Sequence, residues 1–138
     1  MNTTKKTARN LVDVRIILSV LWVARMLSGL QGDSTRFHDP VALKELVEGT
    51  TAVIVTNELL LIMSLIFSVP IFMIFLSLIL EYKVNRLTNL IIGIFFVLFD
   101  LIFLVLFLGK FSYETFWSIV YPVFPVLIVW YAWRWRNS

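Results

Sequence analysis

Cysteine is absent from this chain, histidine occurs once, and charged residues make up only 15% of its 138 positions. Without cysteine, the protein has no disulfide, no thiolate metal site and no thiol redox chemistry. The single His38 directly precedes a helix start, where a role in the turn is the simpler interpretation. No glycine-rich phosphate loop, His-Glu-x-x-His helix or Ser-His-Asp set can be assembled. We therefore expect no enzymatic activity, no catalytic residue, no cofactor and no metal.

Long apolar runs dominate what is present. Hydrophobic residues make up 59% of the chain, and the mean hydropathy is +0.89, which is too apolar for a soluble domain of this size. Residues 59–80 and 115–133 carry no charge, residues 87–109 carry only Asp100, and residues 16–32 carry only Arg25. A hydrocarbon core about 30 Å thick needs about 20 helical residues. The sequence predicts one all-α integral membrane domain, residues 1–138, built as an antiparallel four-transmembrane-helix bundle with spans at about 14–30, 52–80, 87–108 and 115–133.

The segment between the first two spans has the pattern of a short helix. Asp39 followed by Pro40 is a favourable N-terminus, because aspartate caps the helix and proline suits its first turn. Leu43, Leu46 and Val47 form one apolar stripe ahead of a glycine at position 49. We expect a short amphipathic helix at the membrane interface, with a solvated loop helix as the alternative.

Turns and prolines divide the remaining apolar sequence. Lys83, Asn85 and Arg86 predict a tight turn into the third span, and residues 110–114 predict a turn into the fourth. Pro70 lies inside the second span, where it removes a backbone hydrogen bond and favours a kink. Pro122 and Pro125 lie inside the fourth span.

Basic residues are distributed unevenly between the two sides that four spans define. The side shared by both termini and the 81–86 turn holds eight, namely Lys5, Lys6, Arg9, Arg15, Lys83, Arg86, Arg134 and Arg136. The other side holds Arg36, Lys44 and Lys110. The positive-inside rule therefore predicts a multi-pass protein of the cell (cytoplasmic) membrane with cytoplasmic N- and C-termini. The basic residues meet lipid headgroups in this arrangement, so we expect no nucleic-acid partner.

The first residues also match the start of a secretory signal peptide, because Lys5, Lys6 and Arg9 precede an apolar run. Arg25 interrupts that run, and no Ala-x-Ala-like cleavage site follows. We expect the first span to be retained.

Two charged residues fall at the same depth in the predicted bilayer. Arg25 lies ten residues beyond Arg15, or about 15 Å along the helix, and Asp100 lies eleven residues beyond Asn89, or about 16 Å. An unpaired charge near the midplane costs at least about 2.5–3.5 kcal/mol, so we predict direct contact between Arg25 and Asp100. The pair either lines a substrate or ion path or locks the first span against the third. In a further alternative, Arg25 extends outward toward Asp33.

Other polar residues extend this candidate site. Ser68 in the second span and Tyr121 in the fourth lie at a similar depth, and together with Arg25 and Asp100 they form the candidate intramembrane polar site. Asp33 and Glu58 form a candidate site at the outer interface, although Glu58 also fits a hydrated cap of its helix.

Several motifs resemble a family of small prokaryotic four-helix membrane proteins that is catalogued as a domain of unknown function. The resemblance covers nearly the whole chain, and its most specific parts are the Lys-Val-Asn-Arg turn and the Trp-Tyr-Ala-Trp ending. Its motifs are Leu18-Ser19-Val20-Leu21-Trp22, Asp39-Pro40, Asn57-Glu58, Pro70, Ser77, Lys83-Val84-Asn85-Arg86, Asn89, Gly93 and Trp130-Tyr131-Ala132-Trp133. The resemblance implies a four-helix integral membrane protein and carries no activity with it.

Two functions follow from these expectations. The first is a non-enzymatic accessory or interaction subunit that acts through helix–helix contacts. The alternative is a small oligomeric transporter or channel that uses the midplane polar site around Arg25 and Asp100. The expected partners are the lipid bilayer and either further copies of the chain or another membrane protein. Flux measured in proteoliposomes would separate the two functions, and the most informative structural observation is whether a water-filled cavity reaches Asp100.

Overall fold

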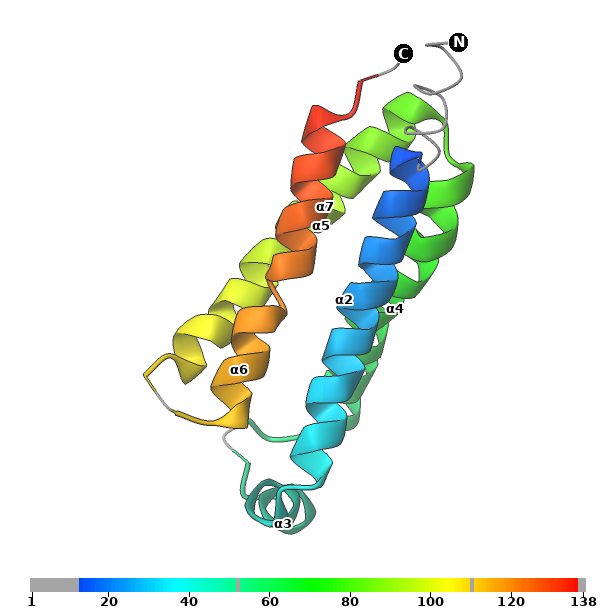
Figure 1. Ribbon diagram of the computed structural model, residues 1–138. Helices are drawn as coiled ribbons and strands as arrows, with labels where there is room; N and C mark the ends of the chain where they lie inside the picture. Colours follow the sequence, from blue (N-terminus) through cyan, green and yellow to red (C-terminus); the bar gives the residue numbers. More distant parts are fainter. Residues whose placement is uncertain (1–12, 52, 110, 137–138) are drawn as a thin grey trace.

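The computed structural model describes residues 13–51, 53–109 and 111–136, and within these ranges it contains helices and no strand (Figure 1). The helices are α2 (Val14–Phe37), α3 (Pro40–Glu48), α4 (Asn57–Ile79), α5 (Tyr82–Phe107), α6 (Tyr113–Val120) and α7 (Val123–Arg134). Lys5, Lys6, Arg9 and Lys110, which contribute to the predicted topology, lie outside the described residues.

Four segments are long and apolar enough to cross a membrane. They are α2, α4, α5 and the combined segment Tyr113–Arg134 formed by α6 and α7. Each has 22 to 26 residues, which at about 1.5 Å per residue exceeds a hydrocarbon core of about 30 Å. Successive segments run in opposite directions, and α3 lies across the end away from the start of α2 and the end of α7 (Figure 1).

The four segments do not touch one another equally. α2 packs against α4 on one side and against α6 and α7 on the other, and α5 packs against α6 and α7. Contacts between α4 and α5 are sparse, because the two helices separate with distance from the turn that joins them (Figure 1). α2 and α5 make little direct backbone contact among the described residues. The seam between α4 and α5 is therefore the least closed side of the structure.

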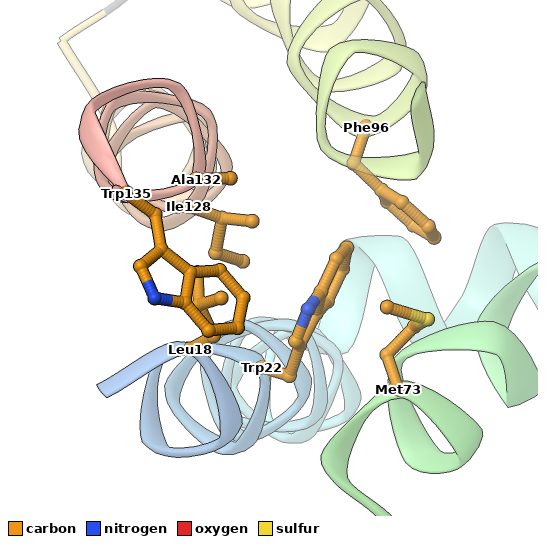
Figure 2. Close-up of a cluster of buried hydrophobic side chains, with 7 residues drawn as sticks. All are labelled: Leu18, Trp22, Met73, Phe96, Ile128, Ala132 and Trp135. Atoms are coloured by element: carbon orange, nitrogen blue, oxygen red, sulfur yellow. The ribbon is translucent and has the colours of Figure 1, made fainter. Parts of the chain in front are cut away.

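The apolar core lies in the half of the structure that is nearer the α4–α5 turn. Figure 2 shows Trp22 of α2 pointing between Met73 of α4 and Phe96 of α5. The rings of Trp22 and Phe96 meet edge to face, with centroids 5.6 Å apart. Leu18, Ile128, Ala132 and Trp135 complete the core. Large apolar side chains elsewhere on α4 and α5 are exposed, as lipid-facing surfaces are.

The helix between the first two spans has the predicted bounds. The Asp39 carboxylate accepts a hydrogen bond from the backbone amide of Val41, Pro40 opens the helix, and Gly49 ends α3 with a φ of 70°. A left-handed φ is readily adopted only by glycine, which explains the abrupt end.

The predicted turn at Lys83, Asn85 and Arg86 is wrong, because these residues form the first turns of α5. The chain reverses at Leu80 and Glu81 instead. The side chains of Asn85 and Arg86 instead donate hydrogen bonds to carbonyl groups at helix ends. Asn85 donates to the Ser77 and Leu80 carbonyls at the end of α4. Arg86 donates to the Ala132 and Trp133 carbonyls at the end of α7.

Other boundaries also differ from those predicted. α2 continues to Phe37, beyond the predicted end at residue 30, and α4 begins at Asn57 because the Thr56 hydroxyl caps it through the Leu59 amide. α6 already begins at Tyr113, inside the predicted turn. The predicted fourth span is two helices separated at Tyr121 and Pro122, where proline has no amide hydrogen to continue the ladder.

Candidate intramembrane site

The predicted contact between Arg25 and Asp100 is confirmed. The Arg25 Nε donates to Asp100 Oδ2 at 2.8 Å, and Nη2 donates to Oδ1 at 2.6 Å. Both side chains are buried, with exposed residue fractions of 3% and 0%. Two parallel charge-assisted hydrogen bonds are the geometry that guanidinium and carboxylate groups favour. The alternative in which Arg25 extends to Asp33 is therefore wrong.

The ion pair connects two helices, α2 and α5, that make little direct backbone contact. α2 supplies Arg25 and α5 supplies Asp100 from across the structure, so the long arginine side chain fills the intervening space. The guanidinium carbon lies 5.4 Å from the ring centroids of both Phe96 and Tyr121. Both rings are thus within cation–π distance of the buried guanidinium group.

Two glycines of α2 make room for these groups. A Cβ added at Gly29 would lie 3.1 Å from Arg25 Nη1, so its absence lets the guanidinium lie against the helix. A Cβ added at Gly32 would collide with the Tyr121 hydroxyl. Tyr121 itself lies at the break between α6 and α7, which brings its ring beside Arg25.

A cavity of about 430 Å³ lies beside the ion pair. Residues of α2, α4, α5 and α6 line it, and Arg25, Asp100, Ser68 and Tyr121 are among them. The structure therefore brings all four residues of the predicted intramembrane site to one cavity. Ser68 donates its hydroxyl hydrogen to the Leu65 carbonyl at 2.7 Å, which leaves the oxygen lone pairs as acceptors.

The cavity extends from the ion pair toward the end that carries α3. Its lining on α2 begins at Arg25 and reaches Asp33 and Arg36. The Arg36 Nη2 lies 3.1 Å from Oε2 of Glu114, the first-turn carboxylate of α6. Glu58 is exposed in the first turn of α4 and does not line this cavity. Asp33 and Glu58 therefore do not share the cavity as one outer-interface site.

The far end of the structure is tied together by α3. The Tyr113 hydroxyl of α6 donates to Asp39 Oδ2 at 2.6 Å. This hydrogen bond is the main reason that the pKa of Asp39 lies below its usual value, and the backbone amides of the α3 N-terminus lower it further.

Sequence reasoning missed a buried polar network on the other side of the ion pair. The indole Nε1 of Trp22 donates to Asn89 Oδ1 at 2.8 Å, and the Ser77 hydroxyl donates to the same oxygen at 3.3 Å. The Asn89 amide donates to Asn85 Oδ1 at 2.7 Å. The sequence feature that could have predicted this network is the spacing of Asn85 and Asn89, which are four residues apart and therefore lie on one helix face.

This network contains residues that carry the family resemblance. Trp22, Ser77, Asn85 and Asn89 join α2, α4 and α5, and Gly93 allows α5 to approach α7, because a Cβ there would lie 2.9 Å from Val129 Cγ2. In the described ranges, no buried side-chain nitrogen or oxygen lacks a hydrogen-bond partner. These motif residues therefore have a structural explanation.

Four apolar segments around a cavity that holds a buried ion pair define the class: a protein whose described secondary structure is all helical, with four candidate membrane spans. Within that class, the chain belongs to a family of unknown function (DUF6326), which matches residues 10–138. The predicted resemblance to such a family is confirmed. No curated protein and no solved structure matches the chain.

Proposed function

We propose that this protein is an antiparallel four-helix protein of the cell membrane and that it binds a small, largely apolar molecule in its cavity. Binding of this molecule is the first step of transport by a small transporter. The observation that carries the proposal is the cavity of about 430 Å³ beside the Arg25–Asp100 pair. Ligand sites are typically about 300–1,000 Å³, mostly apolar, with a few fixed polar groups. This cavity has those properties.

Its walls suit an apolar ligand. Aromatic rings from three helices line it, among them Phe67 of α4, Phe99 and Phe103 of α5, and Trp117 of α6. Polar groups also line it: Arg25, Asp100 and Ser68 are among them, and Asp33, Arg36 and Glu114 lie toward the α3 end. A ligand with an apolar body and a polar group therefore matches the lining better than an ion alone.

The seam between α4 and α5 offers a route of access. Both helices contribute to the lining, and they contact each other sparsely. A ligand dissolved in the bilayer would reach the cavity there without crossing water.

The closed inner end favours a carrier over an open channel. Beyond the ion pair, Trp22, Met73 and Phe96 fill the space, and each is at most 1% exposed. Passage through the protein would require helices to move, and the break at Tyr121 and Pro122 is a natural place for such movement. The accessory-subunit function stays a prediction; the cavity favours the transporter alternative.

The membrane orientation rests on the basic bias described above, which supports cytoplasmic termini. Cysteines introduced as Thr3→Cys and Phe111→Cys in the otherwise cysteine-free chain should react with an impermeant maleimide from opposite sides of the membrane. Labelling of both from one side would contradict this topology.

Photolabelling tests the binding function directly. The protein in nanodiscs is irradiated with a decanol that carries a diazirine, and the labelled residues are mapped by mass spectrometry. We expect enrichment on cavity residues, and loss of that enrichment in Ser68→Trp, which fills the cavity. Ile102→Trp is the matched control, because Ile102 of α5 is 59% exposed and does not line the cavity. Equal labelling of the cavity in wild type and Ser68→Trp would contradict the proposal.

A further inference from the structure

The charges that line the cavity do not balance. Five ionisable aspartate, glutamate and arginine side chains line it, two of them cationic (Arg25, Arg36) and three anionic (Asp33, Asp100, Glu114). Arg25 pairs with Asp100 at 2.6 Å, and Arg36 pairs with Glu114 at 3.1 Å. One carboxylate is left over.

That carboxylate is Asp33. Among the described residues it has no hydrogen-bond donor and no ion-pair partner within 4.0 Å. Both arginines that line the cavity already bind another carboxylate. Asp33 is therefore the one cavity carboxylate among the described residues that has no direct ion-pair partner, and it lies at the α3 end of the cavity.

The aromatic side chains that line the cavity also favour a cationic ligand. The faces of aromatic rings carry negative potential and attract cations within about 6 Å. Two rings of the lining already lie near guanidinium groups: the Arg25 carbon is 5.4 Å from the Tyr121 centroid, and the Arg36 carbon is 5.9 Å from the Phe107 centroid. Phe67, Phe99 and Trp117 line the cavity as well. Such a lining favours cations over anions.

The inner end supplies a hydrogen-bond donor. Arg25 Nη1 has no acceptor among the described residues. Nη1 lies beside Gly29, because a Cβ added there would be 3.1 Å from it, and Arg25 and Gly29 both line the cavity. Asp33 lies eight residues farther along α2, or about 12 Å. The two unused groups therefore lie at opposite ends of one drug-sized space.

We propose that the ligand of this cavity is a lipophilic organic cation, whose charged group lies at Asp33, whose apolar body lies between the aromatic walls, and whose far end accepts a hydrogen bond from Arg25. This inference rests on the proposed function and specifies its substrate class. Asp33 is the residue that discriminates by charge.

Two ions of nearly equal shape and opposite charge, neither of which has a hydrogen-bond acceptor for Arg25, test the charge preference assigned to Asp33. Tetraphenylphosphonium and tetraphenylborate each carry four phenyl groups, and their binding is measured by equilibrium dialysis against the full chain in a neutral detergent. We expect tetraphenylphosphonium to bind more tightly. Asp33→Asn should weaken it about tenfold, equivalent to about 1.4 kcal/mol, and Asp33→Glu should restore it. Glu58→Gln removes an exposed carboxylate outside the cavity and should change nothing.

The outcomes separate the two proposals. The Asp33 side chain makes no hydrogen bond within the described structure, so Asp33→Asn should fold, and its thermal midpoint checks this. Unchanged binding in Asp33→Asn, or tighter binding of tetraphenylborate, overturns the cation inference. If tetraphenylborate binds and Ser68→Trp abolishes its binding, the binding function stands with a different substrate class. Failure of both ions overturns the inference, and the photolabelling result then decides the binding function by itself.

Discussion

Removing one partner of the Arg25–Asp100 pair should damage the protein far more than removing both. The pair is at most 3% exposed and makes two charge-assisted hydrogen bonds. A single change strands a buried charge at a cost of roughly 3–5 kcal/mol, whereas apolar replacement of both partners is often close to neutral. We expect Arg25→Leu and Asp100→Leu each to lower the thermal midpoint strongly, and the double variant to recover most of the loss.

The two single variants should also differ from each other. In Arg25→Leu the remaining carboxyl group can take up a proton and become neutral. In Asp100→Leu the remaining guanidinium stays charged, because arginine does not lose its proton in proteins. Asp100→Leu should therefore be the more destabilised single variant at neutral pH, and Arg25→Leu should recover relative to it when the pH is lowered.

Thermal unfolding in detergent measures all four proteins of this cycle. The Arg36–Glu114 pair provides the matched control, because its side chains are 48% and 29% exposed. A comparable cycle there should give a coupling of about 1 kcal/mol or less. If the Arg25→Leu/Asp100→Leu protein loses as much as the two single variants together, the residues are not coupled and the reasoning is refuted.

Three other substitutions test neighbouring parts of the structure. Gly32→Ala drives a methyl group into the Tyr121 hydroxyl and should cost about 1–3 kcal/mol; Tyr121→Phe should recover only part of this loss, because the ring carbon Cζ would still lie 2.8 Å from the added Cβ, and a stable Gly32→Ala protein would contradict the close approach. Asn89→Leu leaves the buried indole nitrogen of Trp22 without an acceptor and should cost about 1–3 kcal/mol, seen as a lower thermal midpoint; an unchanged midpoint would show that the network adds no stability. Tyr113→Phe removes the hydrogen bond that lowers the pKa of the α3 N-cap carboxylate. A carboxyl group whose pKa is lowered by folding stabilises the protein above its unfolded pKa, and this stabilisation is lost as the pH falls through the folded pKa. The difference in thermal midpoint between wild type and Tyr113→Phe should therefore be larger at about pH 7 than at about pH 3. The reverse trend would refute this assignment.

Local patterns in the sequence predicted the parts of the fold that local physics determines. The apolar runs predicted the four candidate spans, and Asp39, Pro40 and Gly49 predicted both ends of α3, because capping depends on residues within a few positions of the helix end. The contact between Arg25 and Asp100 followed from helix rise and the cost of charge in lipid. That argument needed no knowledge of which helices are neighbours.

The parts that were missed depend on contacts between distant segments. Asn85 and Arg86 resemble turn residues until their acceptors on α4 and α7 are known. The cavity arises because α4 and α5 separate, and no residue pattern encodes that angle. The charge left on Asp33 appears only after Glu114 is found beside Arg36.

The long sequence separation of the ion pair has a consequence for synthesis of the protein. Asp100 follows Arg25 by 75 residues, so at about 5–20 residues per second the ribosome reaches it roughly 4–15 s later. During that interval the first span carries an arginine near its centre with no counter-ion, which opposes its transfer into lipid by about 2.5–3.5 kcal/mol. We expect α2 to stay beside the insertion machinery until α5 has emerged from the ribosome, so that the two helices enter the bilayer together.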